Sequence, residues 1–114
     1  MCIRDSKGGS VALVSQSGAI GVAALDYAHQ HDLGISKFVS IGNKAVIDES
    51  DVIEYLIDDE ATKIITLYAE DISHPARFIE VAKKASAKLK PILIIKTGRS
   101  VRGAIATHSH TRCV

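Results

Sequence analysis

A polar stretch at the end of an apolar run carries the residue types from which a phosphate site can be built. Ser15-Gln16-Ser17-Gly18 stands where the apolar run gives way to an alanine-rich, helix-favouring stretch. Backbone N–H groups at a helix N-terminus lack partners, and the helix dipole favours an anion there. We therefore predict a phosphate cradle formed by the N–H groups of Ser17, Gly18 and Ala19. The hydroxyls of Ser15 and Ser17 would add donors. On these residues alone, a plain helix cap at Ser17 and a plain turn at Gly18 are equally favoured.

A carboxylate and a histidine elsewhere in the chain have the chemistry to handle a phosphoryl group. Glu70 follows the apolar run 63–68, and it could hold a histidine in one tautomer and orientation. Alternatively, Glu70 caps the next helix, as Asp71 also could. His110 lies in the stretch 97–111, which has no clear periodicity. A neutral imidazole is a competent nucleophile towards phosphorus, although most loop histidines are solvated bystanders.

Composition and charge exclude several classes of protein. The 114 residues predict one domain, with the 46% hydrophobic and 24% charged content of ordinary globular proteins. A net charge of +1 gives no basic field for nucleic acid, and no apolar run is long enough for a membrane span. No apolar signal segment is present, so we expect a cytoplasmic location. Cys2 and Cys113 predict no disulfide framework, and the isolated pair His108 and His110 is too little to predict a metal site.

Four apolar runs without regular polar alternation predict strands that are buried on both faces of a parallel sheet. They cover 11–15, 37–41, 63–68 and 91–96. The stretches between them predict three helices: one over 19–31, one starting at Asp48 or Ser50, and one starting at Ser73 with Pro75 in its first turn. The predicted buried faces of these helices are Ile20, Ala23, Ala24, Tyr27 and Ala28; Val52, Ile53, Leu56 and Ile57; and Phe78, Ile79, Ala82 and Ala85.

The alternation of strands and helices predicts an α/β fold with a parallel sheet and right-handed crossovers. The sheet is short by at least one element, so we expect the domain over 7–114 to be truncated at its C-terminal end. The first six residues, MCIRDS, fit none of this pattern and are interpreted as an artefactual leader.

Five segments in order resemble the phosphohistidine-bearing domain of NDP-forming acyl-CoA synthetases, a succinyl-CoA-ligase-like flavodoxin domain that also occurs in ADP-forming acetate–CoA ligases. They are VALVSQSGAIG, SIGNKAVID, LYAEDI, KPILIIKTGRS and SHT. The resemblance covers about 9–111. It implies a three-layer, flavodoxin-like parallel sheet with strand order 2-1-3-4, in which the carboxyl ends of the first and third strands are adjacent and Ser17 and Glu70 face one cleft. It also implies that His110 carries the phosphoryl group, that Glu70 steadies this histidine, and that the helix start at Ser17 receives the phosphate. A further loop of Gly42, Asn43 and Lys44 follows the second strand and is a candidate part of the active site.

The resemblance also implies a reaction: acyl-CoA, ADP and phosphate give the acid, CoA and ATP through an acyl phosphate and a phosphohistidine. CoA, ADP or ATP, and Mg²⁺ would bind to other parts of the complete enzyme, namely a CoA-binding Rossmann domain and an ATP-grasp domain or subunit. We therefore expect this fragment to bind no cofactor and to be inactive alone. Val22 stands where succinate-specific members place a tyrosine, which favours a simpler small carboxylic acid such as acetate.

Other interpretations remain open at this point. The chain could be a non-catalytic acyl-CoA-sensing domain of a protein lysine acetyltransferase, or a flavodoxin-like module for another phosphate ligand. The presence of His110 favours the ligase, because members of the sensing group can lack this histidine. The spacing from Gly98 favours His110 over His108 as the phosphorylated residue. Arg112, Cys113 and Val114 depart from the glycine and small residues that normally follow SHT.

Overall fold

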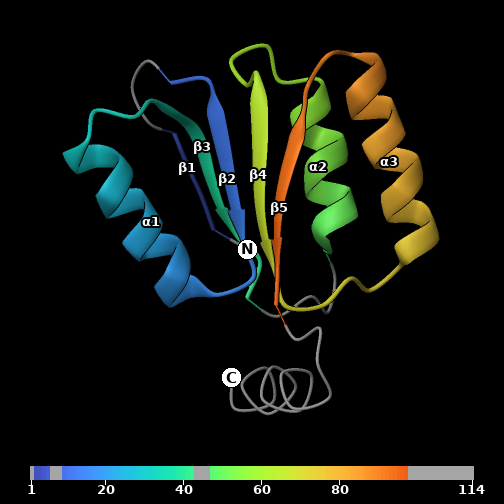
Figure 1. Ribbon diagram of the computed structural model, residues 1–114, viewed down its shortest axis with the longest axis horizontal. Coiled ribbons are helices and arrows are strands. Elements are labelled where there is room, and N and C mark those ends of the chain that lie inside the picture. Colours follow the sequence, from blue (N-terminus) through green and yellow to red (C-terminus); the bar gives the residue numbers. More distant parts are fainter. Residues whose placement is uncertain (1, 6–8, 43–46, 98–114) are drawn as a thin grey trace.

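The computed structural model describes residues 2–5, 9–42 and 47–97 of the chain. One helix covers one face of a central sheet and two helices cover the other face, which gives three layers (Figure 1). In chain order the elements are β1 (Cys2–Asp5), β2 (Val11–Ser15), α1 (Gly18–Gln30), β3 (Ile35–Ser40), α2 (Glu49–Ile57), β4 (Ile64–Ala69), α3 (Pro75–Ala87) and β5 (Ile92–Lys96).

The sheet confirms the predicted topology. Its strand order is β1-β3-β2-β4-β5, and β3, β2, β4 and β5 are mutually parallel. These four strands are the four apolar runs in the order 2-1-3-4. At the end of β2, Ser15 pairs with Ser40 of β3 on one side and with Tyr68 of β4 on the other. The carboxyl ends of β2 and β4 are therefore adjacent, as expected at a switch point.

Strand β1 was not predicted, because residues 1–6 had been excluded from the fold. Cys2–Asp5 pairs antiparallel with β3, with Cys2 opposite Ser40 and Asp5 opposite Lys37. Without β1, the outer edge of β3 would present unpaired backbone groups, and an extended segment can pair with such an edge without an apolar pattern of its own. The sequence therefore carried no signal for this strand. The interpretation of residues 1–6 as a leader stays a prediction.

The main hydrophobic core lies between the sheet and the two helices α2 and α3. The predicted stripe of α2 is confirmed, because Val52, Ile53, Leu56 and Ile57 are all buried. On α3 the prediction is wrong at Ile79, which is 54% exposed, whereas Val81 is buried at 3%. The face that packs is Phe78, Val81 and Ala85, whose i, i+3, i+7 spacing sets the helix phase.

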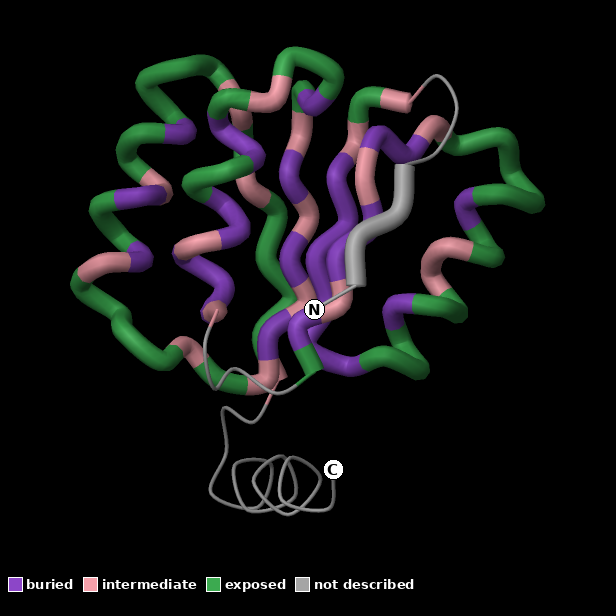
Figure 2. The backbone as a smooth tube through the Cα atoms, turned by 180° about the vertical axis from the view of Figure 1, so that it is seen from behind, coloured by how far each residue is buried: buried purple, intermediate pink, exposed green. Residues whose placement is uncertain are grey.

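Helix α1 contacts the sheet through small residues, and its predicted apolar face is only partly right. Gly21 and Ala28 are buried, but Ile20 and Tyr27 are 43% and 59% exposed. A Cβ added at Gly21 would lie 2.8 Å from the Phe38 ring, so this glycine allows the helix to approach β3 closely. Figure 2 shows α1 mostly exposed, whereas buried residues recur along α2 and α3.

Strand β5 forms the other edge of the sheet and is largely uncovered. The prediction that it is buried on both faces is wrong, since Leu93, Ile94 and Ile95 are 59%, 44% and 58% exposed. Within the described residues, β5 pairs with β4 on one side only. Among the helices that the structure describes, none is long and apolar enough to cross a membrane.

Candidate functional site

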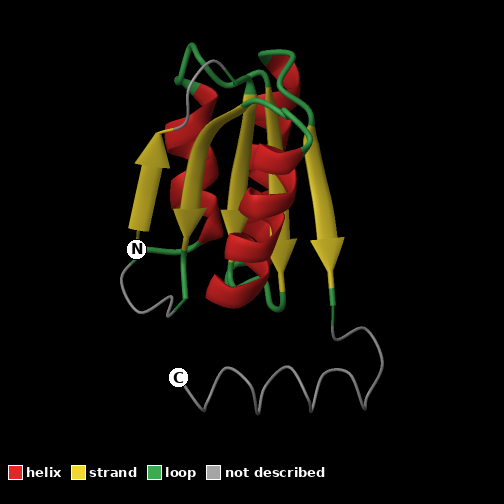
Figure 3. Ribbon diagram, turned by 90° about the vertical axis from the view of Figure 1, so that its left-hand side faces the viewer, coloured by secondary structure: helices red, strands yellow, loops and turns green. Residues whose placement is uncertain are grey.

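The parallel strands end at one edge of the sheet, which we call the carboxyl edge (Figure 3). Helices α1, α2 and α3 all begin at this edge, because each helix follows a parallel strand. In such sheets ligands bind outside the carboxyl ends of the strands, where helix N-termini present their unpaired N–H groups. The segments SQSG (residues 15–18) and AED (residues 69–71) both lie here.

The two serines of SQSG hold the turn between β2 and α1 together. Ser17 is the N-cap of α1, and its Oγ accepts a hydrogen bond from the N–H of Ile20 at 3.3 Å. The Ser15 hydroxyl donates to the Ser17 carbonyl oxygen at 2.6 Å and accepts from the Ser17 N–H at 3.1 Å. Both side chains are buried, at 0% and 4% exposed. These contacts use the Ser15 hydroxyl and the Ser17 N–H within the turn, and they use the Ser17 Oγ as an acceptor.

The N–H groups of Gly18 and Ala19 are the donors that this turn leaves at the surface. Both residues are exposed, and neither N–H has an acceptor among the residues that the structure describes. A Cβ added at Gly18 would meet nothing closer than the Ser40 Oγ at 3.9 Å, and the Gly18 φ is not in the left-handed region. Packing and backbone conformation therefore do not require a glycine here. The missing side chain instead leaves the space above the first turn open.

Glu70 stands one residue beyond β4 and is half-buried. Its N–H donates to the Gln16 Oε1 at 2.7 Å, and its carbonyl oxygen accepts from the Lys96 Nζ at 2.9 Å. The structure thus brings Glu70 and the SQSG turn together through a direct contact between the two segments. Gln16 was not singled out in the sequence analysis. A polar side chain at the end of a run buried on both faces was the available signal, since such a group needs a partner.

The N-termini of α2 and α3 form a charged cluster at the same edge. The Asp48 carboxylate caps α2 by accepting from the Asp51 N–H at 3.0 Å, so of the two predicted helix starts, Asp48 and Ser50, the structure has Asp48. The His74 Nδ1 lies 3.0 Å from an oxygen of the Asp48 carboxylate. The Arg77 guanidinium lies 3.5 Å from the Asp48 carboxylate and 2.6 Å from the Asp51 carboxylate. Burial raises the pKa of Asp48, but the hydrogen bonds from Asp51 and His74 and the charge of Arg77 outweigh it and hold that pKa below its usual value.

Several predicted residues lie outside the described part of the chain. They are Asn43, Lys44, His108 and His110, so their predicted roles stay predictions. Gly42 is described and exposed, and among the described residues, apart from its chain neighbours, none has an atom within 4 Å of a Cβ built on it. Within the described ranges, no group of three or more His, Cys, Asp or Glu side chains is placed to hold a metal ion.

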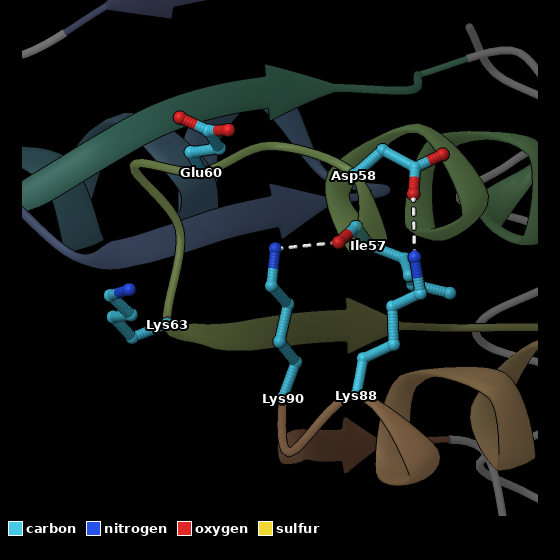
Figure 4. A pocket seen from close by; sticks show the side chains of 6 residues that line it. All are labelled: Ile57, Asp58, Glu60, Lys63, Lys88 and Lys90. Carbon is cyan, nitrogen blue, oxygen red and sulfur yellow. Dashed lines mark hydrogen bonds and ion pairs between the residues drawn. The ribbon is translucent and has the colours of Figure 1, made fainter.

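A surface cavity of about 590 Å³ lies away from this edge, near the C-terminal ends of α2 and α3 (Figure 4). Six residues line it: Ile57, Asp58, Glu60, Lys63, Lys88 and Lys90. Lys90 caps the end of α2 by donating to the carbonyl oxygens of Leu56, Ile57 and Asp59 at 3.2, 2.6 and 2.6 Å. Lys88 pairs with Asp58 at 3.2 Å. Two of its three lysines thus have protein partners, so the cavity is a weaker candidate than the carboxyl edge.

A family model and two curated relatives match most of the chain. The model of the "succinyl-CoA ligase like flavodoxin domain" family matches residues 8–114. The chain is 50% identical over 103 residues to the alpha subunit of acetate–CoA ligase (ADP-forming) I of Pyrococcus furiosus, covering 90% of this chain and 22% of that one. It is 53% identical over 103 residues to acetate–CoA ligase (ADP-forming) of Methanocaldococcus jannaschii, covering 90% and 14%.

A solved structure agrees closely with the fold. It is the dinucleotide-forming acetyl-coenzyme A synthetase 1 of Ca. Korarchaeum cryptofilum in complex with phosphate and ADP. Its TM-score is 0.86 at 43% sequence identity, and the match covers 95% of this chain and 24% of that one. The chain therefore spans about a quarter or less of the proteins that it matches.

Proposed function

The chain belongs to the family of succinyl-CoA-ligase-like flavodoxin domains, and we propose that it is part of an ADP-forming acid–CoA ligase. The complete protein would convert acyl-CoA, ADP and phosphate into the acid, CoA and ATP. The relatives that support this proposal are ADP-forming acetate–CoA ligases and an acetyl-CoA synthetase. They do not favour the alternative of an acyl-CoA-sensing domain in an acetyltransferase.

The observation that carries the proposal is the open N-terminus of α1 beside Glu70. Gly18 and Ala19 offer two N–H groups at the positive end of a 13-residue helix, with no side chain above Gly18. Such an arrangement favours a phosphoryl group by hydrogen bonding and by the helix dipole. The related synthetase was solved with phosphate, which fits this chemistry. Phosphoryl transfer requires positioning and charge stabilisation, and a helix N-terminus supplies both.

In the proposed reaction the histidine acts as a temporary carrier. A nitrogen of the His110 imidazole attacks the phosphorus of an acyl phosphate, forming a P–N bond while the bond from phosphorus to the acyl oxygen breaks and the acid leaves. Glu70 would accept a hydrogen bond from the other ring nitrogen, which holds the tautomer and stabilises the positive charge that develops. Transfer of the phosphoryl group to ADP then restores the histidine. Gly42, Asn43 and Lys44 belong to a neighbouring loop of this proposed site.

Other parts of the complete protein would supply the remaining binding sites. We infer a CoA-binding Rossmann domain and an ATP-grasp domain or subunit, with CoA, ADP or ATP, and Mg²⁺ bound there. We propose that the acid is small, of the acetate type, because Val22 stands where succinate-specific members have a tyrosine. The Val22 side chain is 53% exposed on α1, so a substrate or another domain could reach it.

Phosphorylation of the full-length protein tests the proposal. Incubation with labelled ATP and Mg²⁺ should give an acid-labile, base-stable label on His110, which His110→Asn removes and His108→Asn retains. Glu70→Gln should slow the labelling, because the imidazole loses its orienting charge. A label that depends on His108 instead would move the carrier to that residue. A label unaffected by both substitutions would contradict the ligase proposal.

A further inference from the structure

At Gln16 the parallel hydrogen-bond ladder between β2 and β4 is only half made by the backbone. The Gln16 N–H still makes a ladder bond, donating to the Tyr68 carbonyl oxygen at 3.1 Å. In a regular parallel pair, the Gln16 carbonyl oxygen would then accept from the Glu70 N–H. Here the Glu70 N–H donates instead to the Gln16 side chain, at 2.7 Å from Oε1. The carboxamide thus replaces the backbone and extends the ladder beyond β2.

The same carboxamide holds the residue that follows. Oε1 also accepts from the Asp71 N–H at 3.1 Å, and Nε2 donates to the Asp71 carbonyl oxygen at 2.7 Å. Both acceptor positions of the amide oxygen and one of its two donors are therefore used by backbone groups of the AED segment. The side chain is 7% exposed, so water does not compete effectively for these bonds.

Lys96 restrains Glu70 from the other side. Its Nζ donates to the Glu70 carbonyl oxygen at 2.9 Å and to the Thr97 carbonyl oxygen at 2.5 Å. The N–H and the carbonyl oxygen of Glu70 are thus each bonded to a side chain, one from the end of β2 and one from the end of β5. Lys96 is exposed and Gln16 is buried, so the buried amide is the stronger restraint.

We propose that Gln16 is a positioning residue for Glu70. It ties the AED segment to the turn that starts α1, so that the Glu70 carboxylate and the Gly18 and Ala19 N–H groups keep a fixed relation. This inference rests on the proposed function, in which Glu70 orients the phosphorylated histidine. An error of about 1 Å in the position of a reacting group can cost on the order of 100-fold in rate. The three amide bonds would prevent such an error.

A double-mutant cycle in the full-length ligase tests the proposal. Gln16→Met keeps the length of the side chain and removes all three bonds, and we expect the rate of histidine labelling by ATP to fall about 10- to 100-fold. In a Glu70→Gln background the same change should cost about two-fold or less, because Gln16 would act through Glu70. Gln16→Asn has a side chain too short to reach Asp71, so it should behave like Gln16→Met. It replaces Gln16→Met in the cycle if the methionine variant does not fold.

Ser36→Ala is the matched control. The Ser36 Oγ makes a buried hydrogen bond of 2.8 Å with the Thr62 Oγ1, near the opposite ends of the strands, so its loss should lower the melting temperature and leave the labelling rate unchanged. Equal losses from Gln16→Met in both backgrounds, or wild-type labelling in that variant, would overturn the inference alone. Absence of any label from the wild-type protein would overturn the proposed function, and the inference with it.

Discussion

The two faces of the sheet differ in the size of the side chains that the helices bury on them. Helices α2 and α3 bury large apolar side chains, including Ile53, Leu56 and Phe78, and the residues Arg77 and Glu54 pair across them at 3.1 Å. Helix α1 buries only Gly21 and Ala28. The first face therefore supplies most of the packing energy of the domain. The second face holds a lightly packed helix, α1. Its N-terminus lies beside β2 and β4, where unpaired N–H groups can bind an anion.

The largest effect is expected on the α2/α3 face. Leu56 is 0% exposed, so Leu56→Ala should lower the free energy of unfolding by about 2–5 kcal/mol through lost burial and a residual cavity. Tyr55 is the adjacent control, 55% exposed, and Tyr55→Ala should change it by about 0.5 kcal/mol or less. Urea denaturation measures both. Equal costs at the two positions would contradict the assignment of the core to this face.

A smaller effect is expected where α1 touches the sheet. Replacing glycine by alanine inside a helix normally stabilises by about 0.5–1 kcal/mol. At Gly21 the new methyl group would lie 2.8 Å from the Phe38 ring and 3.0 Å from the Ser15 Cβ, so Gly21→Ala should instead destabilise by about 1–3 kcal/mol. Gly18→Ala, which meets no such contact, is the control. A stabilising Gly21→Ala in the same denaturation experiment would show that α1 does not pack closely.

The smallest effect concerns the pH dependence at the N-terminus of α2. The folded pKa of Asp48 lies below its usual value near 3.8. Its ionised form therefore contributes stability that is complete above that value and is lost as the pH falls through the lowered folded pKa. Asp48→Asn keeps a capping side chain but carries no charge, so the free energy of unfolding should fall at neutral pH and change little at the acid end, which makes the acid limb of the stability curve shallower. Unfolding free energies between about pH 2 and pH 6 test this, and an unchanged acid limb would contradict it.

The sequence was sufficient for the topology because buried parallel strands leave a strong pattern. Four apolar runs predicted β3, β2, β4 and β5, and the resemblance to a flavodoxin-like domain predicted their order. The phase of α3 could not be predicted, because Ile79 and Val81 are equally apolar and only packing decides which is buried. Strand β1 left no apolar signal, since an edge strand pairs through its backbone.

The site was predicted in part, for a similar reason. Strand ends locate Ser17 and Glu70 at one edge without knowledge of side-chain contacts. The bonds of Ser15 within its own turn depend on a local geometry that spacing does not reveal. The link from Gln16 to Glu70 joins residues 54 positions apart, so no local pattern could indicate it.

Phosphate binding by a Gly18→Val variant of the full-length protein tests the central claim most directly. The valine side chain has space beside Ser40, so the unfolding free energy should change little, but it would occupy the place of a phosphate over the Gly18 and Ala19 N–H groups. We predict that titration with inorganic phosphate detects binding to the wild-type protein and none to a folded Gly18→Val variant. Equal phosphate affinity in the two proteins would contradict the claim and leave SQSG as a helix cap alone.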